Sequence, residues 1–298
     1  MSSKDHLKEA MVDISTDVEK LLNRLIPDVS GDEKQLFDAM RYVVFAGGKR
    51  LRPFLVVASS EMFGVDRSVA MRTAAAIECV HSYSLVHDDL PAMDDDELRR
   101  GKLTAHLEFD EATAILAGDG LQTLAFEILA DEASHPDPRV RLELIRTLAQ
   151  ASGVHGMVGG QMIDLVAENK TLDLSGITRL QQMKTGALIC YSAEAGAILG
   201  KADRHRRHLL YGYAKDLGLA FQIADDLLDH EGDATAMGKA TGKDTERGKA
   251  TFVAHLGPER ARQQARILAD QAIEHLQEFG EKAALLNSLA HYVIDRQN

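Results

Sequence analysis

Residues 203–230 read Asp-Arg-His-Arg-Arg-His-Leu-Leu-Tyr-Gly-Tyr-Ala-Lys-Asp-Leu-Gly-Leu-Ala-Phe-Gln-Ile-Ala-Asp-Asp-Leu-Leu-Asp-His. Large apolar side chains recur there every four or seven residues, at Leu209, Tyr213, Leu217, Phe221 and Leu228. This is the period of one face of an α-helix. Small and apolar residues also occupy the other sides, which predicts a central helix wrapped by others.

The same spacing of three and four recurs along nearly the whole chain, while strand-like alternation is scarce. We predict helices at about 4–25, 32–46, 51–63, 67–93, 106–132, 138–154, 157–167, 175–199, 203–230, 257–278 and 281–296. Ser30 and Glu33 have the spacing of a capping box at the start of the second helix. Because no composition shift marks a linker, we predict one all-α domain over residues 1–298, a helical bundle.

The chain has 298 residues and a formal net charge of −12 at pH 7. An acidic chain is a poor candidate for binding nucleic acid, because neutralising phosphates needs a basic face. Cys79 and Cys190 are far apart in sequence and indicate neither a disulfide framework nor a zinc site, so we expect a reducing cytoplasm. Residues 1–9 lack the apolar core of an export signal, and no apolar run approaches the roughly 18 residues that span a membrane.

Two acidic clusters interrupt the apolar helices. The first runs from Asp88-Asp89 through Leu-Pro-Ala-Met to 94–97, and the second is Asp225-Asp226-Leu-Leu-Asp229. The second has apolar flanks, and burying unpaired carboxylates is costly, so a cation is the natural partner. Oxygen-only ligands indicate Mg²⁺. The alternative interpretation of each cluster is a solvated run of charge at a helix end.

Basic residues gather where a magnesium-bound phosphate would need them. A glycine turn at 47–48 precedes Lys49, Arg50 and Arg52, and Arg99-Arg100 directly follows the first acidic cluster. Further lysines occur at 184, inside an apolar helix, and at 239, 243 and 249. Together they predict a metal–diphosphate site, since arginine grips phosphate in a bidentate manner. Ordinary surface charge is the alternative for Arg50, Lys102 and Lys243, and a solvated helix face is preferred for the basic run at 204–208.

Six ordered sequence blocks resemble those of the trans-prenyltransferases, or isoprenyl diphosphate synthases. The blocks are Gly48-Lys49-Arg50-Leu51-Arg52-Pro53, the stretch from Glu78 to Gly101, Gly160-Gln161-Met-Ile-Asp164, Lys184-Thr185-Gly186, the stretch from Phe221 to Asp229, and Gly248-Lys249-Ala-Thr251. The likeness covers about residues 40–255 and is closest to the bacterial farnesyl type. It implies an all-α bundle around a deep central cavity, a homodimer, and Mg²⁺-dependent condensation of isopentenyl diphosphate with allylic diphosphates.

The resemblance also implies roles for individual residues. Metal ligands would be Asp88, Asp89, Asp94, Asp225, Asp226 and Asp229. Catalytic residues would be Asp88, Asp89, Asp94, Arg99, Lys184, Asp225 and Lys239. Substrate-binding residues would be Gly48, Lys49, Arg52, His81, Arg99, Arg100, Lys184, Thr185, Gln222, Lys239 and Lys249. On an ideal helix Asp94 would lie about 240° from Asp88, but Pro91 should loosen the turn between them.

Product length depends, in the family, on bulky residues one or two turns before the first aspartate. Here Tyr83 lies five residues before Asp88, and the smaller Ser84, four residues before it, lies nearer the helix face that carries Asp88. With the two extra residues Pro91-Ala92 inside the motif, this favours farnesyl diphosphate (C15). C10 and C20 products stay open, as does the interpretation of Tyr83 as a plain core residue.

Three other functions compete with this one. The pair His87-Asp88 is also typical of all-α metal-dependent phosphohydrolases, although these need further histidine ligands. Terpene cyclases ionise the same substrates, but their second metal motif usually mixes Asn, Ser and Glu. A non-catalytic regulatory subunit should have lost aspartates or arginines, and both clusters are intact here.

Overall fold

The computed structural model describes residues 3–167, 170, 172–232 and 251–295. Within these residues almost every element is a helix, which confirms the predicted all-α fold. The α-helices are α1 (Ser3–Leu25), α2 (Lys34–Val44), α3 (Leu51–Met62), α4 (Arg67–Asp88), α5 (Ala105–Glu108), α6 (Glu111–Ala130), α7 (Pro138–Ser152), α8 (Met157–Ala167), α9 (Leu174–Gln181), α10 (Ala187–Leu199), α11 (Arg204–His230), α14 (Phe252–Leu256), α15 (Pro258–His275) and α16 (Ala284–Ile294).

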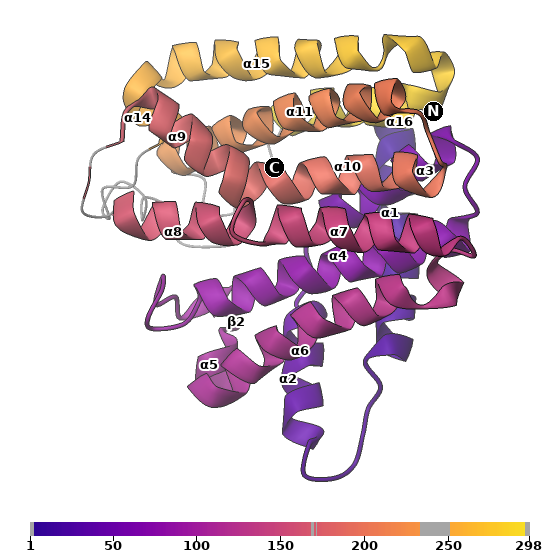
Figure 1. Cartoon of the computed structure of the whole chain (residues 1–298). Coiled ribbons are helices and arrows are strands. Elements are labelled where there is room, and N and C mark those ends of the chain that lie inside the picture. The colour runs from indigo at the N-terminus through magenta and orange to yellow at the C-terminus, as the bar shows by residue number, and fades with distance from the viewer. Residues whose placement is uncertain (1–2, 168–169, 171, 233–250, 296–298) are drawn as a thin grey trace.

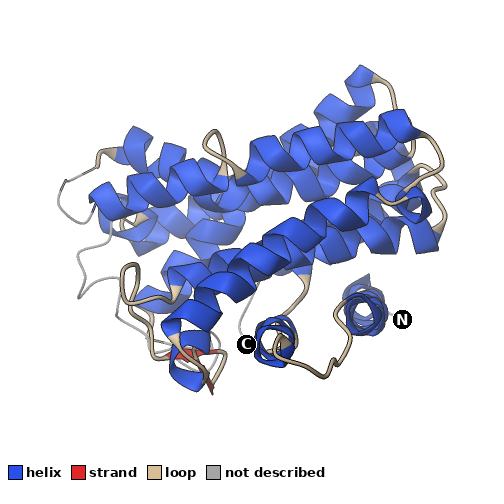
Figure 2. Cartoon of the chain, turned by 60° about the horizontal axis from the view of Figure 1, so that its bottom comes forward, coloured by secondary structure: helices blue, strands red, loops and turns tan. Residues whose placement is uncertain are grey.

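Shorter elements link these helices. Two 3₁₀ segments, η1 (Glu132–Ser134) and η3 (Gln277–Ala283), lie beside α7 and α16 in sequence, and one π-helical turn, η2 (Gln182–Gly186), joins α9 to α10. The strands β1 (Leu98–Arg99) and β2 (Lys102–Leu103) form an antiparallel hairpin that the sequence did not predict. The hairpin is the red element in Figure 2.

Helix α11 occupies the centre of one half of the molecule, as its sequence predicted. It packs along α15 on one side and α10 on another, while α10 packs against α3, and α4 packs against α3 and α6 (Figure 1). Tyr213 and Leu217 of the predicted stripe are fully buried. The C-terminal ends of α4 and α11 lie at the same end of the bundle, on the left of Figure 1.

Aspartate side chains begin several of these helices. Asp66, Asp110 and Asp203 accept hydrogen bonds from backbone N–H groups in the first turns of α4, α6 and α11. Such caps satisfy N–H groups that have no partner within the helix. The predicted capping box is wrong: α2 begins at Lys34, and its N-cap Glu33 makes no side-chain cap bond.

Three predicted helices differ from the observed ones in where they end or break. The helix predicted at 67–93 ends at Asp88, because Pro91 lacks an N–H to continue the ladder and disfavours helical geometry before it. The helix predicted at 106–132 is two helices, since Asp110 has an extended backbone (φ −164°) and starts α6 anew. The stretch predicted at 175–199 is helical throughout but contains the π turn η2.

Candidate functional site

One cavity of about 1010 Å³ opens between the helices and collects most of the predicted site residues. Those that line it are Gly48, Lys49, Arg52, His81, Tyr83, Ser84, Asp88, Arg100, Lys184, Thr185, Gln222, Asp225 and Asp226. Apolar side chains such as Met157, Leu188 and Phe221 complete its wall. The cavity wall therefore contains both charged groups and an apolar surface. Lys239, Lys243 and Lys249 lie outside the described residues.

The first acidic cluster folds back on itself after α4. The backbone N–H of Asp94 donates to the carbonyl of Asp88 at 2.8 Å, so the turn returns Asp94 to the helix end. Burial raises the pKa of Asp88 to about 6, and the negative charges of Asp94 and Asp89 add to this, against the pull of Lys184 and Arg99. Carboxylates held this close to one another suit a cation.

Asp89 and Arg99 form an ion pair beside this turn. Arg99 Nε donates to Asp89 Oδ1 at 3.0 Å, its Nη2 contacts the same oxygen, and Asp96 lies 3.6 Å from that Nη2. The β1–β2 hairpin brings Arg99 to the helix end. Two residues to which the sequence assigned separate roles, metal ligand and phosphate ligand, are thus partners here.

The second acidic cluster ends α11. Gln222 Nε2 donates to Asp226 Oδ1 at 3.0 Å, and the backbone N–H of Phe252 donates to Asp226 Oδ2 at 2.9 Å. Asp229 is buried one turn further on, and Asp225 lines the cavity. In the described part of the chain, no three carboxylate, imidazole or thiol groups lie close enough to form a metal cage. The six predicted metal ligands thus fall into two groups, one after the end of α4 and one at the end of α11.

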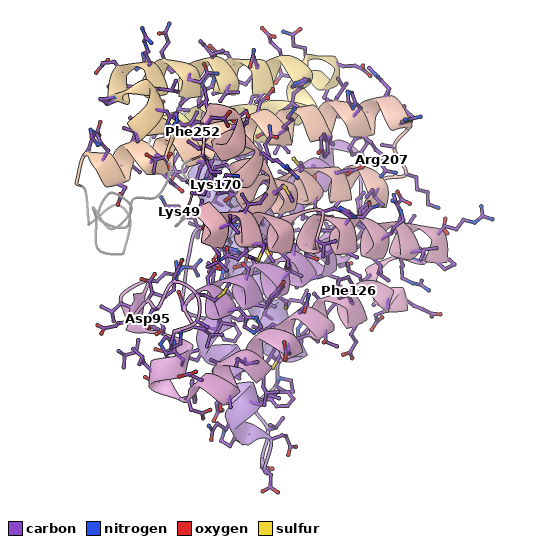
Figure 3. The ribbon with its side chains drawn as sticks, turned by 60° about the vertical axis from the view of Figure 1, so that its left-hand side comes forward. Lys49, Asp95, Phe126, Lys170, Arg207 and Phe252 are labelled. Atoms are coloured by element: carbon purple, nitrogen blue, oxygen red, sulfur yellow. The ribbon has the colours of Figure 1, made fainter. Side chains whose placement is uncertain are left out.

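After the glycine turn that precedes α3, the side chains of Lys49 and Arg50 differ in burial. Gly47, Gly48 and Arg50 all have positive φ, and the chain there exposes Lys49 but buries Arg50. Lys49 lies at the same end of the molecule as Phe252 of α14 (Figure 3). The alternative interpretation of Arg50 as an ordinary surface charge is wrong, because its side chain is 1% exposed and pairs with Glu78. Lys102, by contrast, is exposed, in keeping with surface charge.

Arg52 and Arg100 reach the cavity from either side of that turn. Arg52 Nη1 lies 3.3 Å from Nε2 of His81, and Arg100 Nη1 donates to the carbonyl of Gly47. Gly48 has φ +120°, a backbone conformation that L side chains rarely adopt, and the Arg100 guanidinium packs against it. Burial and the surrounding guanidinium groups hold the pKa of His81 well below its ordinary value. Since an arginine only donates, Nε2 of His81 accepts and its proton lies on Nδ1.

Lys184 sits in the π turn and bridges two helices. Its Nζ lies 2.6 Å from Asp164 Oδ2 on α8 and 3.8 Å from Asp88 Oδ2 on α4. Burial opposes its charge, but Asp88 and Asp164 outweigh burial and raise the pKa of Lys184. Gly160 allows α8 to come this close, because a Cβ there would be 2.2 Å from the Lys184 backbone nitrogen. A π turn of this kind is frequent at functional sites.

Tyr83 and Ser84 both line the cavity, one turn before the acidic end of α4. The Tyr83 ring packs edge-on against His87, with centroids 5.5 Å apart.

The phosphohydrolase alternative needs His87 as a metal ligand, but Nε2 of His87 lies 3.0 Å from the carbonyl of Ile115 on α6. Gly118 makes room for this ring, since a Cβ there would be 2.1 Å from Nε2.

Sequence reasoning missed the partners that hold these groups in place. Glu78, Asp164 and Gly160 lie in the motifs already quoted, yet no role was assigned to them. The apolar neighbours Ile77, Cys79 and Val80 were a signal that Glu78 is buried, since a buried carboxylate needs a partner. No comparable local signal linked Asp164 to Lys184, because they are twenty residues apart.

Comparison with known proteins places this arrangement among relatives. The family model described as Polyprenyl synthetase matches residues 33–290. The chain is 49% identical over 282 residues to farnesyl diphosphate synthase of Escherichia coli (strain K12), covering 92% of this chain and 94% of that protein. It is 40% identical to geranylgeranyl diphosphate synthase of Cyanophora paradoxa, covering 94% and 93%. The apo crystal structure of an FPP/GFPP synthase from Zymomonas mobilis matches with a TM-score of 0.89 and 52% identity, covering 98% and 99% of the two chains.

Proposed function

The chain belongs to the polyprenyl synthetase family, as its motifs predicted, and we propose that it is a farnesyl diphosphate synthase. It is a transferase that joins isopentenyl diphosphate head to tail with dimethylallyl and then geranyl diphosphate. The observation that carries this function is one cavity shared by both acidic clusters and by cations. Asp88 ends α4, Asp225 lies near the end of α11, and Arg52 and Lys184 line the same space.

Magnesium fits the site by the chemistry of its donors. Both clusters offer carboxylate oxygens, which Mg²⁺ prefers, and the crowded charge around Asp88 is what a cation would relieve. We assign Asp88, Asp94 and Asp225 as the ligands, with Asp89, Asp226 and Asp229 close behind them. Two half-sites are expected when substrate phosphate oxygens complete the coordination. When bound, Mg²⁺ supplies Lewis-acid stabilisation of the charge on the leaving diphosphate.

The proposed substrate-binding residues form two sets, one for each diphosphate substrate. The allylic diphosphate is assigned to Arg99, Lys184 and Gln222, together with Lys239 and Lys249, which lie outside the described residues. Isopentenyl diphosphate is assigned to Lys49, Arg52, His81 and Arg100, with the backbone of Gly48 beside them. Arginine forks suit phosphate oxygens, and the neutral His81 adds an N–H donor without adding charge.

The reaction needs charge stabilisation more than proton transfer. The allylic C–O bond breaks and its electron pair leaves with the diphosphate, where Arg99 and Lys184 stabilise the developing negative charge. Thr185 Oγ1 lies 3.5 Å from Gln222 Oε1. In this proposal both oxygens would stabilise the allylic cation. The double bond of isopentenyl diphosphate attacks, so that its C4 bonds to C1 of the allylic cation and its C3 becomes cationic. C2 of the isopentenyl unit then loses a proton to the departed diphosphate, and the C–H electrons form the new C2=C3 double bond. This scheme needs no strong side-chain base.

Tyr83 sets the product length in this proposal. Its ring is 6% exposed and lines the cavity one to two turns from Asp88, where it would stop a C15 chain. The alternative is a geranylgeranyl diphosphate synthase that makes C20. That alternative is supported by the 40% identity to the synthase of Cyanophora paradoxa.

We propose that the protein works as a homodimer in the cytoplasm. Leu107 on α5 and Ile115 and Leu116 at the start of α6 are 47%, 43% and 55% exposed, on helices that pack together. Exposed apolar side chains in one region favour burial against a second copy of the chain. Sedimentation should give twice the chain mass, and Leu116→Glu should lower it. No helix in the described ranges has both the length and the apolar character to cross a bilayer.

The experiment that tests the function is product analysis. The purified protein is incubated with Mg²⁺, isopentenyl diphosphate and dimethylallyl or geranyl diphosphate, and the dephosphorylated prenyl chains are sized by chromatography. We expect a dominant C15 chain. A C20 chain would move the assignment to the alternative, and release of phosphate without elongation would contradict the class.

A matched pair of variants tests the site itself. Asp225→Asn should lower kcat at least about a hundredfold, the scale of losing one charge-stabilising group. Asp216→Asn removes a carboxylate two and a half turns earlier on the same helix, outside this cavity. It should leave kcat within about twofold. Equal losses in both variants would contradict the assignment of the second cluster.

A further inference from the structure

The buried carboxylate of Glu78 lies beside the proposed isopentenyl diphosphate site. Glu78 of α4 is 2% exposed and lies at the cavity wall beside Arg50, Arg52 and Arg100. We propose that Glu78 and Arg50 form a positioning pair that fixes the cations of this site, without either residue binding the substrate. The inference rests on the proposed function and adds two residues to which no role in the reaction has been given.

The terminal nitrogens of Arg50 are directed to protein partners. Its Nη1 donates to Glu78 Oε1 at 2.5 Å, and its Nη2 donates to Glu19 Oε1 at 3.0 Å and to the Val44 carbonyl at 2.7 Å. Both terminal nitrogens are therefore occupied, and the residue is only 3% exposed. One side chain thus ties α1, the end of α2 and α4 to the start of α3.

This pair sets the path of the loop that carries the ligands. Arg50 has φ +46°, a left-handed conformation that costs a non-glycine residue energy and persists only when its surroundings hold it. The buried ion pair is what holds it here. Because Arg50 turns inward, Lys49 before it is exposed and Arg52, one residue into α3, reaches the cavity.

Glu78 also balances the charge of the arginines around it. Burial lowers the pKa of Arg52 to about 10, and Glu78 is the strongest influence in the other direction. Burial lowers the pKa of Arg100 as well, again with Glu78 as the main opposing charge. Glu78, with the partly exposed Glu19 as a second partner of Arg50, lets the three guanidinium groups stay close and charged, while their surplus positive charge still attracts an anion.

Glu78 also lies one helical turn before His81. Residues three apart on a helix share a face, so both point toward the loop that precedes α3. His81 in turn contacts Arg52 through Nε2. The Arg50–Glu78 pair is therefore connected to the proposed ligands in two ways, through the backbone of the loop before α3 and through α4.

The test replaces both partners at once, as Arg50→Met/Glu78→Met. Removing one partner leaves a buried charge unpaired and threatens folding, whereas replacing both by apolar groups of similar size is often neutral for stability. The double variant also leaves the net charge unchanged. Glu78→Asp is the companion variant, because it keeps the charge but withdraws it by about 1.5 Å, one bond length.

The matched control is Arg207→Met/Glu194→Met. This pair has a 2.7 Å contact between α11 and α10 and lies outside the cavity. Figure 3 places Arg207 at the far end of the molecule from Lys49. The two pairs are compared by melting temperature, by KM for each substrate, and by calorimetric titration of isopentenyl diphosphate with EDTA and no allylic substrate present.

We expect both site variants to weaken isopentenyl diphosphate binding and raise its KM about ten- to hundredfold, the scale of small misplacements. The KM for geranyl diphosphate should change less than about threefold, and the control should bind as the wild type does. Unchanged or tighter isopentenyl diphosphate binding in the stable double variant overturns the pair. Equal rises of both KM values also overturn it, since they indicate a general structural effect. A wild type that binds isopentenyl diphosphate but makes no longer chain overturns the proposed function instead.

Discussion

Replacing Asp88 with asparagine should make the metal-free protein more stable while it removes activity. Asp88 is half-buried at the cavity, beside Asp89 and Asp94. Its carboxylate is stabilised by Lys184 and Arg99, but these do not outweigh burial and the like charges, so its pKa is raised to about 6. Asparagine has nearly the same shape and carries no charge. The substitution therefore removes an electrostatic cost without creating a cavity.

The size of the effect follows from proton linkage. A pKa of about 6 in the folded protein, against 3.8 as the ordinary value in the unfolded chain, corresponds to about 3 kcal/mol. Because the folded pKa is the higher one, the wild type loses this stability as pH rises from about 3.8 to about 6. At pH 8 the full cost is present in Asp88 and absent from Asp88→Asn. For a chain of this size, that is roughly 4–5 °C in melting temperature.

The assay is thermal unfolding with EDTA at pH 8 and at pH 5. Asp88→Asn should melt above the wild type at pH 8, and the difference should shrink by about half at pH 5, where much of Asp88 is protonated when folded. Asp270→Asn, an exposed position on α15, serves as the control and should not shift the melting temperature. Product formation by Asp88→Asn should fall at least about a hundredfold at either pH.

Two results would refute the reasoning. A variant that melts at or below the wild type at pH 8 would mean that the attraction of Asp88 to Lys184 exceeds the cost of burial. A difference that stays constant between pH 8 and pH 5 would mean that the effect does not come from the charge of Asp88. Either result would contradict the inference that the acidic cluster after α4 binds a cation.

Three further predictions concern the cavity and the core. Tyr83→Ala should lengthen the main product from C15 to C20 in the sizing assay, and an unchanged C15 product would contradict its role as the floor. Gly160→Ala should lower kcat at least about tenfold and reduce the melting temperature, because its Cβ would lie 2.2 Å from the Lys184 backbone; Gly218→Ala, whose Cβ would be 3.5 Å from its nearest neighbour, is the control. Tyr213→Phe removes a buried 2.8 Å hydrogen bond to a carbonyl of α16 and should cost about 1–2 kcal/mol in urea unfolding with no change in either KM.

The helices and the family motifs could be predicted because they depend on residues that are close together in sequence. The four-residue spacing that ends at Phe221 indicated a helix, and α11 begins and ends within about a residue of the prediction. The acidic motifs and the Lys184-Thr185-Gly186 block indicated the family, which the comparisons confirm. Such features depend on residues within one or two turns of each other, so no knowledge of packing is needed to find them.

Local reasoning went wrong where a backbone departs from the regular period. The sequence predicted a helix through residue 93, but Pro91 ends it and Asp94 returns to hydrogen-bond Asp88. It also predicted a plain helix around Lys184, where the structure has a π turn. One extra residue in a turn or a single reversed φ moves a side chain to another face, and short-range patterns carry little information about this.

The sequence by itself determined the fold class, the family and most of the charged residues that line the cavity. Only the tertiary structure decided how those residues are oriented: Arg50 turns inward to Glu78, Lys184 meets Asp164 across two helices, and Arg99 closes on Asp89. The physical reason is that a buried charge must find its partner wherever packing brings one. That partner can be ten, twenty or twenty-eight residues away, a separation that no helical period can express.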